Sequence, residues 1–140
     1  MRKITGGTGI QYRRHLLAMV LLVGVCLGVL GACQPKLEAR NNDARRAAME
    51  WCRLAEFPSG RTNEQIVISG SSFTRGFEIW FTLTPSDLES WIRNSPGLQD
   101  ASVETNGDGR TYLVKPKDAV YCLVRINEAT GEIYIKTYWS

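Results

Sequence analysis

Three segments of alternating apolar and polar residues constrain the fold of this chain more than any other feature. They are residues 77–84, 120–126 and 132–139. A period of two is typical of a strand that buries one face and exposes the other. Only a short loop separates the last two segments, so we expect them to pair as an antiparallel hairpin. These segments predict an antiparallel sheet with one covered face.

Two helices are predicted beside these strands. Apolar residues recur at helical spacing from Asp43 onwards, Asn42 is the expected N-cap, and the pattern ends before Pro58. The inner face of this helix is small and apolar: Ala44, Ala47, Ala48, Trp51, Cys52 and Ala55. Residues 84–87 (TPSD) predict the start of a second helix, because they supply a capping oxygen, a proline at the first helical position and an acid at the third.

Three further short strands complete the predicted elements. Residues 65–69 read as one strand, and residues 102–105 and 110–114 as two more, joined by the turn-forming residues 106–109 (NGDG). The order helix, strand, strand, helix and then strands is typical of an α+β fold. We therefore expect a single α+β domain over residues 43–140, with an antiparallel sheet and helices packed on one face.

Composition limits the functions that this domain can have. With 140 residues the chain can hold one core. Four of the 17 Lys and Arg residues precede residue 16, so the remainder has 13 against 14 Asp and Glu and a net charge of −1. A nucleic-acid partner is not expected of such a domain. The one histidine, His15, also lies in the leader, so histidine-based catalytic triads and histidine-ligated metals are excluded from the domain.

The first 33 residues have the organisation of an export signal. A basic segment over residues 1–15 precedes an uncharged apolar run over residues 16–30, which ends in the sequence Leu30-Gly31-Ala32-Cys33. An aliphatic residue, two small residues and a cysteine in that order resemble the lipobox of bacterial lipoproteins. The resemblance covers residues 1–33 alone, and no family is recognised for the rest of the chain.

The resemblance implies that residues 1–32 are a lipoprotein signal peptide, with a lipidated Cys33 and a tether over residues 33–42. Diacylglycerol on the Cys33 sulfur, followed by acylation of the freed amine with a fatty acid such as palmitate, would anchor the protein in a bacterial cell envelope. Gln34 is not the aspartate that marks retention in the inner membrane, which favours the outer membrane, facing the periplasm, if the host is Gram-negative.

Three alternatives for the leader stay open. Ordinary secretory cleavage favours a small residue at the position of Leu30. A retained membrane span would need about 20 apolar residues, and residues 16–32 supply 17. The pair Arg13-Arg14 is similar to a twin-arginine signal, although Tyr12 stands where that signal usually has serine or threonine.

The four cysteines divide into two groups. Cys26 lies in the apolar run and Cys33 is the expected lipid site, which leaves Cys52 and Cys122. In an oxidising compartment two remaining cysteines usually pair. The helical period places Cys52 on the inner face of the first helix, and the strand period places Cys122 on the covered face with Val120 and Val124. We therefore expect a disulfide, with two buried free thiols as the alternative. A metal site is not expected, since two thiolates fall short of a zinc tetrahedron.

No motif for catalysis or cofactor binding is present. Residues 104–109 have spacings similar to a calcium loop, but Lys115 stands where a bidentate glutamate is required. Glycine-rich phosphate loops and nucleophile elbows are absent. We name no catalytic residue and expect no cofactor. Four carboxylates leave open a minor cell-wall glycan enzyme that uses a carboxylate pair: Glu78, Asp87, Glu89 and Glu132.

The sheet face turned away from the helices is the strongest candidate for function. Alternation places on it six side chains of the types that dominate recognition surfaces: Trp80, Tyr121, Arg125, Tyr134, Lys136 and Tyr138. Leu123 and Glu78 share this face. An exposed face of this kind would bind an envelope protein or a cell-wall glycan. Alternatively, Phe73 or residues 98–118 would cover it.

Overall fold

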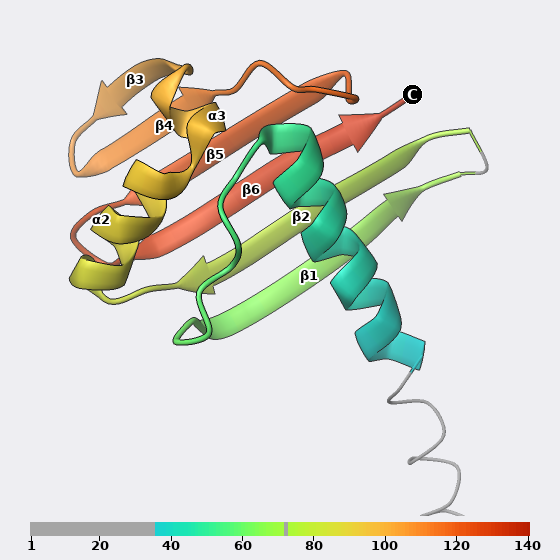
Figure 1. The fold of residues 1–140 in the computed structure, drawn as a ribbon, viewed down its shortest axis with the longest axis horizontal. Helices are drawn as coiled ribbons and strands as arrows, with labels where there is room; N and C mark the ends of the chain where they lie inside the picture. Colours follow the sequence, from blue (N-terminus) through green and yellow to red (C-terminus); the bar gives the residue numbers. More distant parts are fainter. Residues whose placement is uncertain (1–35, 72) are drawn as a thin grey trace, which may run out of the picture. The chain divides into compact units, whose positions relative to one another are not determined.

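Six strands form one antiparallel sheet in the order β1-β2-β6-β5-β4-β3 (Figure 1). This computed structural model describes residues 36–71 and 73–140. The expected signal peptide and the lipid site Cys33 lie outside these residues. The strands are β1 Thr62–Gly70, β2 Arg75–Thr82, β3 Ser102–Asn106, β4 Gly109–Leu113, β5 Tyr121–Asn127 and β6 Glu132–Trp139. The expected hairpins β3–β4 and β5–β6 are both present.

Three helices complete the described fold, and their residues from 41 onwards lie on one face of the sheet (Figure 1). They are the N-terminal helix over residues 36–52, α2 (Pro85–Asn94) and α3 (Pro96–Gln99). The predicted α+β class is confirmed. None of the described helices is long and apolar enough to span a membrane.

The N-terminal helix begins earlier than the sequence pattern predicted. Residues 36–42 are helical, although they were expected to belong to a tether that ended at an N-cap, Asn42. The residues before Asn42 are Leu37, Glu38, Ala39 and Arg40, which are among the strongest helix formers. Because these residues favour a helix, the helix already includes them, and Asn42 lies inside it rather than at its N-cap.

The apolar residues of the alternating segments form the core, as their period predicts. Phe77, Ile79 and Phe81 of β2 are buried, as are Val124 of β5 and Ile135 of β6. The second helix also begins as predicted, since the Thr84 hydroxyl accepts a hydrogen bond from the Asp87 backbone N–H.

Two residues of this pattern are exposed rather than covered: Val120, and Trp139 at the end of β6, whose exposed fraction is 45%. Val120 was expected on the covered face, but it precedes β5 and its exposed fraction is 55%. Its backbone N–H donates to the Tyr138 carbonyl at 3.0 Å. The chain is still bending into the strand there, so the alternation begins one residue later than predicted.

An aromatic cluster joins α2 to the sheet. Ring centroids of Phe57 and Phe81 lie 5.1 Å apart, and those of Phe81 and Trp91 lie 5.8 Å apart in an edge-to-face arrangement. The Trp91 indole N–H donates to the Ala55 carbonyl at 3.3 Å. This bond satisfies the polar atom of a ring that is otherwise buried in the core.

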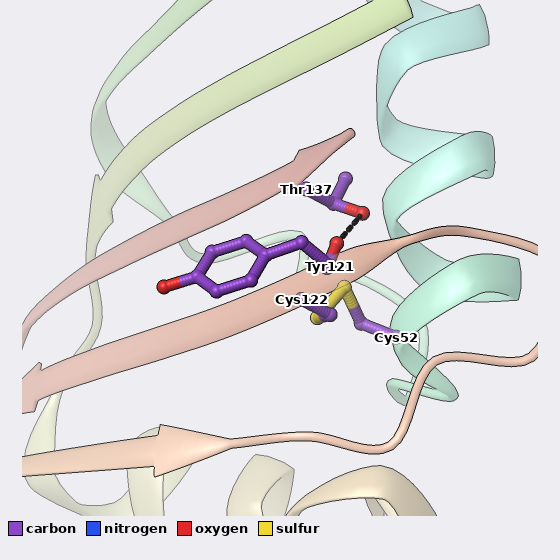
Figure 2. The surroundings of a disulfide bond; sticks show 4 residues. All are labelled: Cys52, Tyr121, Cys122 and Thr137. Atoms are coloured by element: carbon purple, nitrogen blue, oxygen red, sulfur yellow. Dashed lines mark hydrogen bonds between the residues drawn. A yellow bond between two sulfur atoms is a disulfide. The ribbon is translucent and has the colours of Figure 1, made fainter. Parts of the chain in front are cut away.

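The predicted disulfide between Cys52 and Cys122 is present. It joins the end of the N-terminal helix to β5, with Cα atoms 5.7 Å apart (Figure 2). Both cysteines are buried. Beside it, the Thr137 hydroxyl donates to the Tyr121 carbonyl at 2.8 Å.

The α2–α3 corner approaches the same end of the helix very closely. The Gly97 N–H donates to the Arg53 carbonyl at 2.8 Å. A Cβ atom at Gly97 would lie 2.0 Å from the Cys52 carbonyl oxygen, so only glycine fits there. The helix end, α3 and β5 are thus held together at one point.

Candidate binding face

The outer face of the sheet, opposite the helices, carries a row of side chains that crosses five strands. Strand register places Gln65 of β1 beside Trp80 of β2, Tyr134 of β6, Arg125 of β5 and Thr111 of β4. From residue 41 onwards, the helices of the described chain all lie on the other face (Figure 1). Because β2 is the neighbour of β6, the sheet brings Trp80 beside Tyr134 and Arg125, which lie more than forty residues later in the sequence.

The segments that could have covered this face do not do so within the described residues. The side chain of Phe73 is 81% exposed at the β1–β2 connection. Residues 98–118 contribute β3 and β4, which extend the sheet sideways. Leu123 is the exception to an open face, because it is buried between its cross-strand neighbours Lys136 and Leu113.

A hollow of about 820 Å³ lies over the row, and we call it the outer hollow. The aromatic and charged side chains that strand register places on this side of the hollow are Trp80, Tyr134, Arg125 and Glu132. Arg110 also borders the hollow, but its side chain pairs with Glu128 beside α2. Most of its other polar lining consists of amide and hydroxyl side chains: Asn63, Gln65, Asn106, Asn127, Thr82 and Thr111. A volume of this size is within the range of small-molecule sites, about 300–1,000 Å³.

The Trp80–Tyr134 pair forms the aromatic part of the outer hollow. The two ring centroids lie 5.0 Å apart with the planes tilted by 32°. The guanidinium carbon of Arg125 lies 5.9 Å from the Tyr134 ring centroid, which is within cation–π range. These contacts bring the three side chains together on the outer face.

Glu78 fixes the other end of the Tyr134 side chain. The Tyr134 hydroxyl donates to Glu78 Oε2 at 2.8 Å, and Lys136 Nζ lies 3.2 Å from Glu78 Oε1. Burial, together with the hydrogen bond to the anionic Glu78, raises the pKa of Tyr134 to about 12. The hydrogen bond from Tyr134 and the nearby Lys136 lower the pKa of Glu78. At neutral pH the phenol is therefore a hydrogen-bond donor to a carboxylate.

The six predicted face residues separate into two groups. Trp80, Arg125 and Tyr134 line the outer hollow, whereas Tyr121, Lys136 and Tyr138 do not. Tyr121 and Tyr138 stack on each other at 5.2 Å with an interplanar angle of 18°. Strand register places the Glu78–Lys136 pair between the two aromatic groups. The face thus carries two distinct aromatic pairs, and only one of them borders a large hollow.

Sequence reasoning missed the polar rim of the outer hollow. Asn106 is the last residue of β3, Asn63 is the second residue of β1, and Asn127 is the last residue of β5. Asn127 Oδ1 also accepts from the backbone N–H groups of Ala129 and Thr130, at 3.0 and 3.1 Å. These residues appear in sequence as ordinary turn and strand-end residues, so no local pattern distinguishes them.

Three of the four carboxylates that the sequence suggested for an enzyme line different cavities, and the fourth, Asp87, lies in the first turn of α2. The outer hollow is lined by Glu132, a cavity of about 380 Å³ beside α2 by Glu89, and a cavity of about 360 Å³ beside Trp139 by Glu78. The cavity beside α2 also contains Glu128, which forms an ion pair with Arg110. In the described part of the chain, no cluster of His, Cys, Asp and Glu is suited to a metal ion.

The comparisons with known proteins assign no role to this face. Comparison with protein-family models, with curated proteins and with solved structures finds no match.

Proposed function

We propose that this protein is a lipid-anchored component of a bacterial envelope whose disulfide-closed domain binds a partner at the outer hollow. The observation that carries the proposal is the row of Trp80, Tyr134 and Arg125 in a hollow that no described element covers. Tryptophan, tyrosine and arginine carry most of the energy at binding surfaces. Concave surfaces with a few convergent polar groups are the usual form of a ligand site.

The envelope location rests on two features. The Leu30-Gly31-Ala32-Cys33 sequence resembles a lipobox, which would place the domain outside the cytoplasm on a lipid anchor. A buried disulfide is compatible with that compartment, because thiols are not kept reduced there. A domain on such an anchor would hold a bound partner close to the bilayer.

Two tyrosines on the same face supply a matched test. Tyr134 and Tyr121 are both partly buried, and each contacts another aromatic ring, Trp80 or Tyr138. Only Tyr134 lines the outer hollow. The anchored protein would be crosslinked in its own envelope, and the captured material compared between wild type, Tyr134→Ser and Tyr121→Ser.

We expect Tyr134→Ser to weaken capture by about thirty-fold, which corresponds to a hot-spot loss of about 2 kcal/mol. Tyr121→Ser should capture as well as wild type. Thermal unfolding of both variants checks that each remains folded. Equal capture by all three proteins, or loss in Tyr121→Ser alone, would exclude the outer hollow as the binding site.

A further inference from the structure

We infer that the outer hollow binds a glycan that carries carboxylates, with a sugar ring against Trp80 and Tyr134 and a carboxylate at Arg125. The inference rests on the proposed function and names the class of ligand for the same site. Three properties of the outer hollow carry it: its length across the sheet, the chemistry of its lining and its charge.

The row of side chains is long enough for several units of a linear ligand. It runs from Trp80 on β2 across β6 and β5 to Thr111 on β4. Neighbouring strands are about 4.8 Å apart, so the row extends over roughly 14 Å. A single small ring would occupy only part of this length, whereas a short oligosaccharide lying across the strands would contact all of it.

The polar side chains that line the outer hollow would bind the hydroxyl groups of a ligand better than they would bind an apolar side chain of a protein partner. The side chains of Asn63, Gln65 and Asn106 make no hydrogen bond to other described residues. A carboxamide both donates and accepts, which matches the hydroxyls of a sugar. The C–H face of a sugar ring is apolar and can pack on the part of the Trp80 ring that is left accessible, since Trp80 is partly exposed.

A protein partner would find little apolar surface in the outer hollow. Interface centres are more apolar than the rest of a protein surface and poor in charge. The aliphatic and phenylalanine residues of the lining are all buried beneath it, with exposed fractions of 2% for Phe81 and 1% for Ile126 and Ile133. Apart from Trp80 and Tyr134, the accessible lining is therefore polar.

Charge adds a preference for a carboxylate. Arg125 is exposed and forms no ion pair with any described residue, while Arg110 is paired with Glu128. A guanidinium binds a carboxylate through two parallel hydrogen bonds. Glu132 lines the same hollow and disfavours a ligand with closely spaced negative charges. A glycan in which carboxylate-bearing sugars alternate with neutral ones fits this distribution.

Two tetrasaccharides of equal length test the inference on the full-length protein in detergent. One is the peptide-free strand of alternating N-acetylglucosamine and N-acetylmuramic acid, which carries lactyl carboxylates. The other is the N-acetylglucosamine tetramer, which carries none. Calorimetry would measure both affinities for wild type, Trp80→Ala, Arg125→Gln and the control Tyr121→Ser.

We expect wild type to bind the carboxylate-bearing strand about tenfold more tightly than the neutral one, because charge-assisted hydrogen bonds are about twice as strong as neutral ones. Arg125→Gln should remove this preference. Trp80→Ala should weaken both ligands by at least tenfold, and Tyr121→Ser should change neither.

Other outcomes separate this inference from the proposed function. If neither sugar binds but crosslinking still depends on Tyr134, the hollow has a different partner, such as a protein, and the glycan inference is wrong. If sugar binding is unaffected by Trp80→Ala, the glycan lies elsewhere and the inference is again wrong. Equal affinity for both sugars in wild type would overturn the role of Arg125. If crosslinking and calorimetry both fail to detect binding, the proposed function fails as well.

Discussion

At the scale of single residues, Tyr134 connects the aromatic and the charged parts of the outer face. Its ring contacts Trp80 and Arg125, and its hydroxyl donates to Glu78. Glu78 in turn pairs with Lys136. Removing the Tyr134 hydroxyl would leave the ring in place while releasing Glu78 from its strongest partner. This makes the hydroxyl a sensitive probe of the geometry.

We predict that Tyr134→Phe changes how stability depends on pH at alkaline values. The folded pKa of Tyr134 is about 12, raised from 10.0. Stability from a raised pKa is complete below the unfolded value and is lost as pH rises towards the folded value. Wild type should therefore lose more unfolding free energy than Tyr134→Phe between about pH 10 and pH 12.

Denaturant unfolding at a series of pH values would measure this difference. Tyr138→Phe is the control, because the Tyr138 hydroxyl makes no hydrogen bond to other described residues. The variant should follow the wild-type curve. Parallel pH curves for wild type and Tyr134→Phe would show that the hydrogen bond to Glu78 does not form in solution.

At the scale of elements, the disulfide determines how the N-terminal helix is attached to the sheet. Cys52 is the last helical residue and Cys122 is the second residue of β5. The helix has an inner face of small residues, among which Ala44 and Ala48 are fully buried. Alanine allows close approach but buries little apolar area. The disulfide therefore adds to the other contacts of this helix with the sheet, which include the Trp51–Phe77 ring contact and the Arg45–Glu64 ion pair.

We predict that Cys52→Ala lowers the free energy of unfolding by about 4 kcal/mol, the loop-closure value for a sequence separation of 70 residues. Equilibrium denaturation measures the loss. The same variant should make Cys122 reactive to maleimide in the unfolded protein. Reaction of both cysteines in unfolded wild type without reductant would show that the bridge is absent.

At the scale of the whole molecule, the outer face and the leader have to be considered together. The aromatic and polar lining of the outer hollow is the kind of surface that marks an interaction site. The lipobox-like residues 30–33 would concentrate the domain at a membrane, where envelope glycans and proteins are abundant. Anchoring and binding are separable properties, and each has its own test.

We predict that Cys33→Ser yields an unprocessed or soluble protein that incorporates no labelled palmitate. The serine hydroxyl cannot form the thioether to diacylglycerol, so both cleavage after Ala32 and acylation would fail. Metabolic labelling and fractionation of the envelope measure this. Cys26→Ser is the control and should still be labelled. Label in Cys33→Ser would contradict the lipoprotein assignment.

Much of the fold followed from local patterns. A period of two in β2, β5 and β6 predicted which side chains face the helices, because successive residues of a strand point to opposite sides. The Thr84 cap and the β3–β4 turn residues predicted their elements for the same local reason. The disulfide was predicted because the helical spacing places Cys52 on the inner face of its helix and the strand alternation places Cys122 on the covered face of β5. Even the leader could be interpreted from residues that are adjacent in the chain.

The outer hollow depended on contacts that no local pattern contains. The pairing of β2 with β6 places Trp80 opposite Tyr134, although more than fifty residues separate them. The register of strands that are not joined by a tight turn is decided by packing of the whole core. Asn63, Asn106 and Asn127 all line the outer hollow, although they belong to three different strands, β1, β3 and β5. The sequence by itself therefore determined which side chains lie on the outer face, and only the tertiary structure decided which of them share a site.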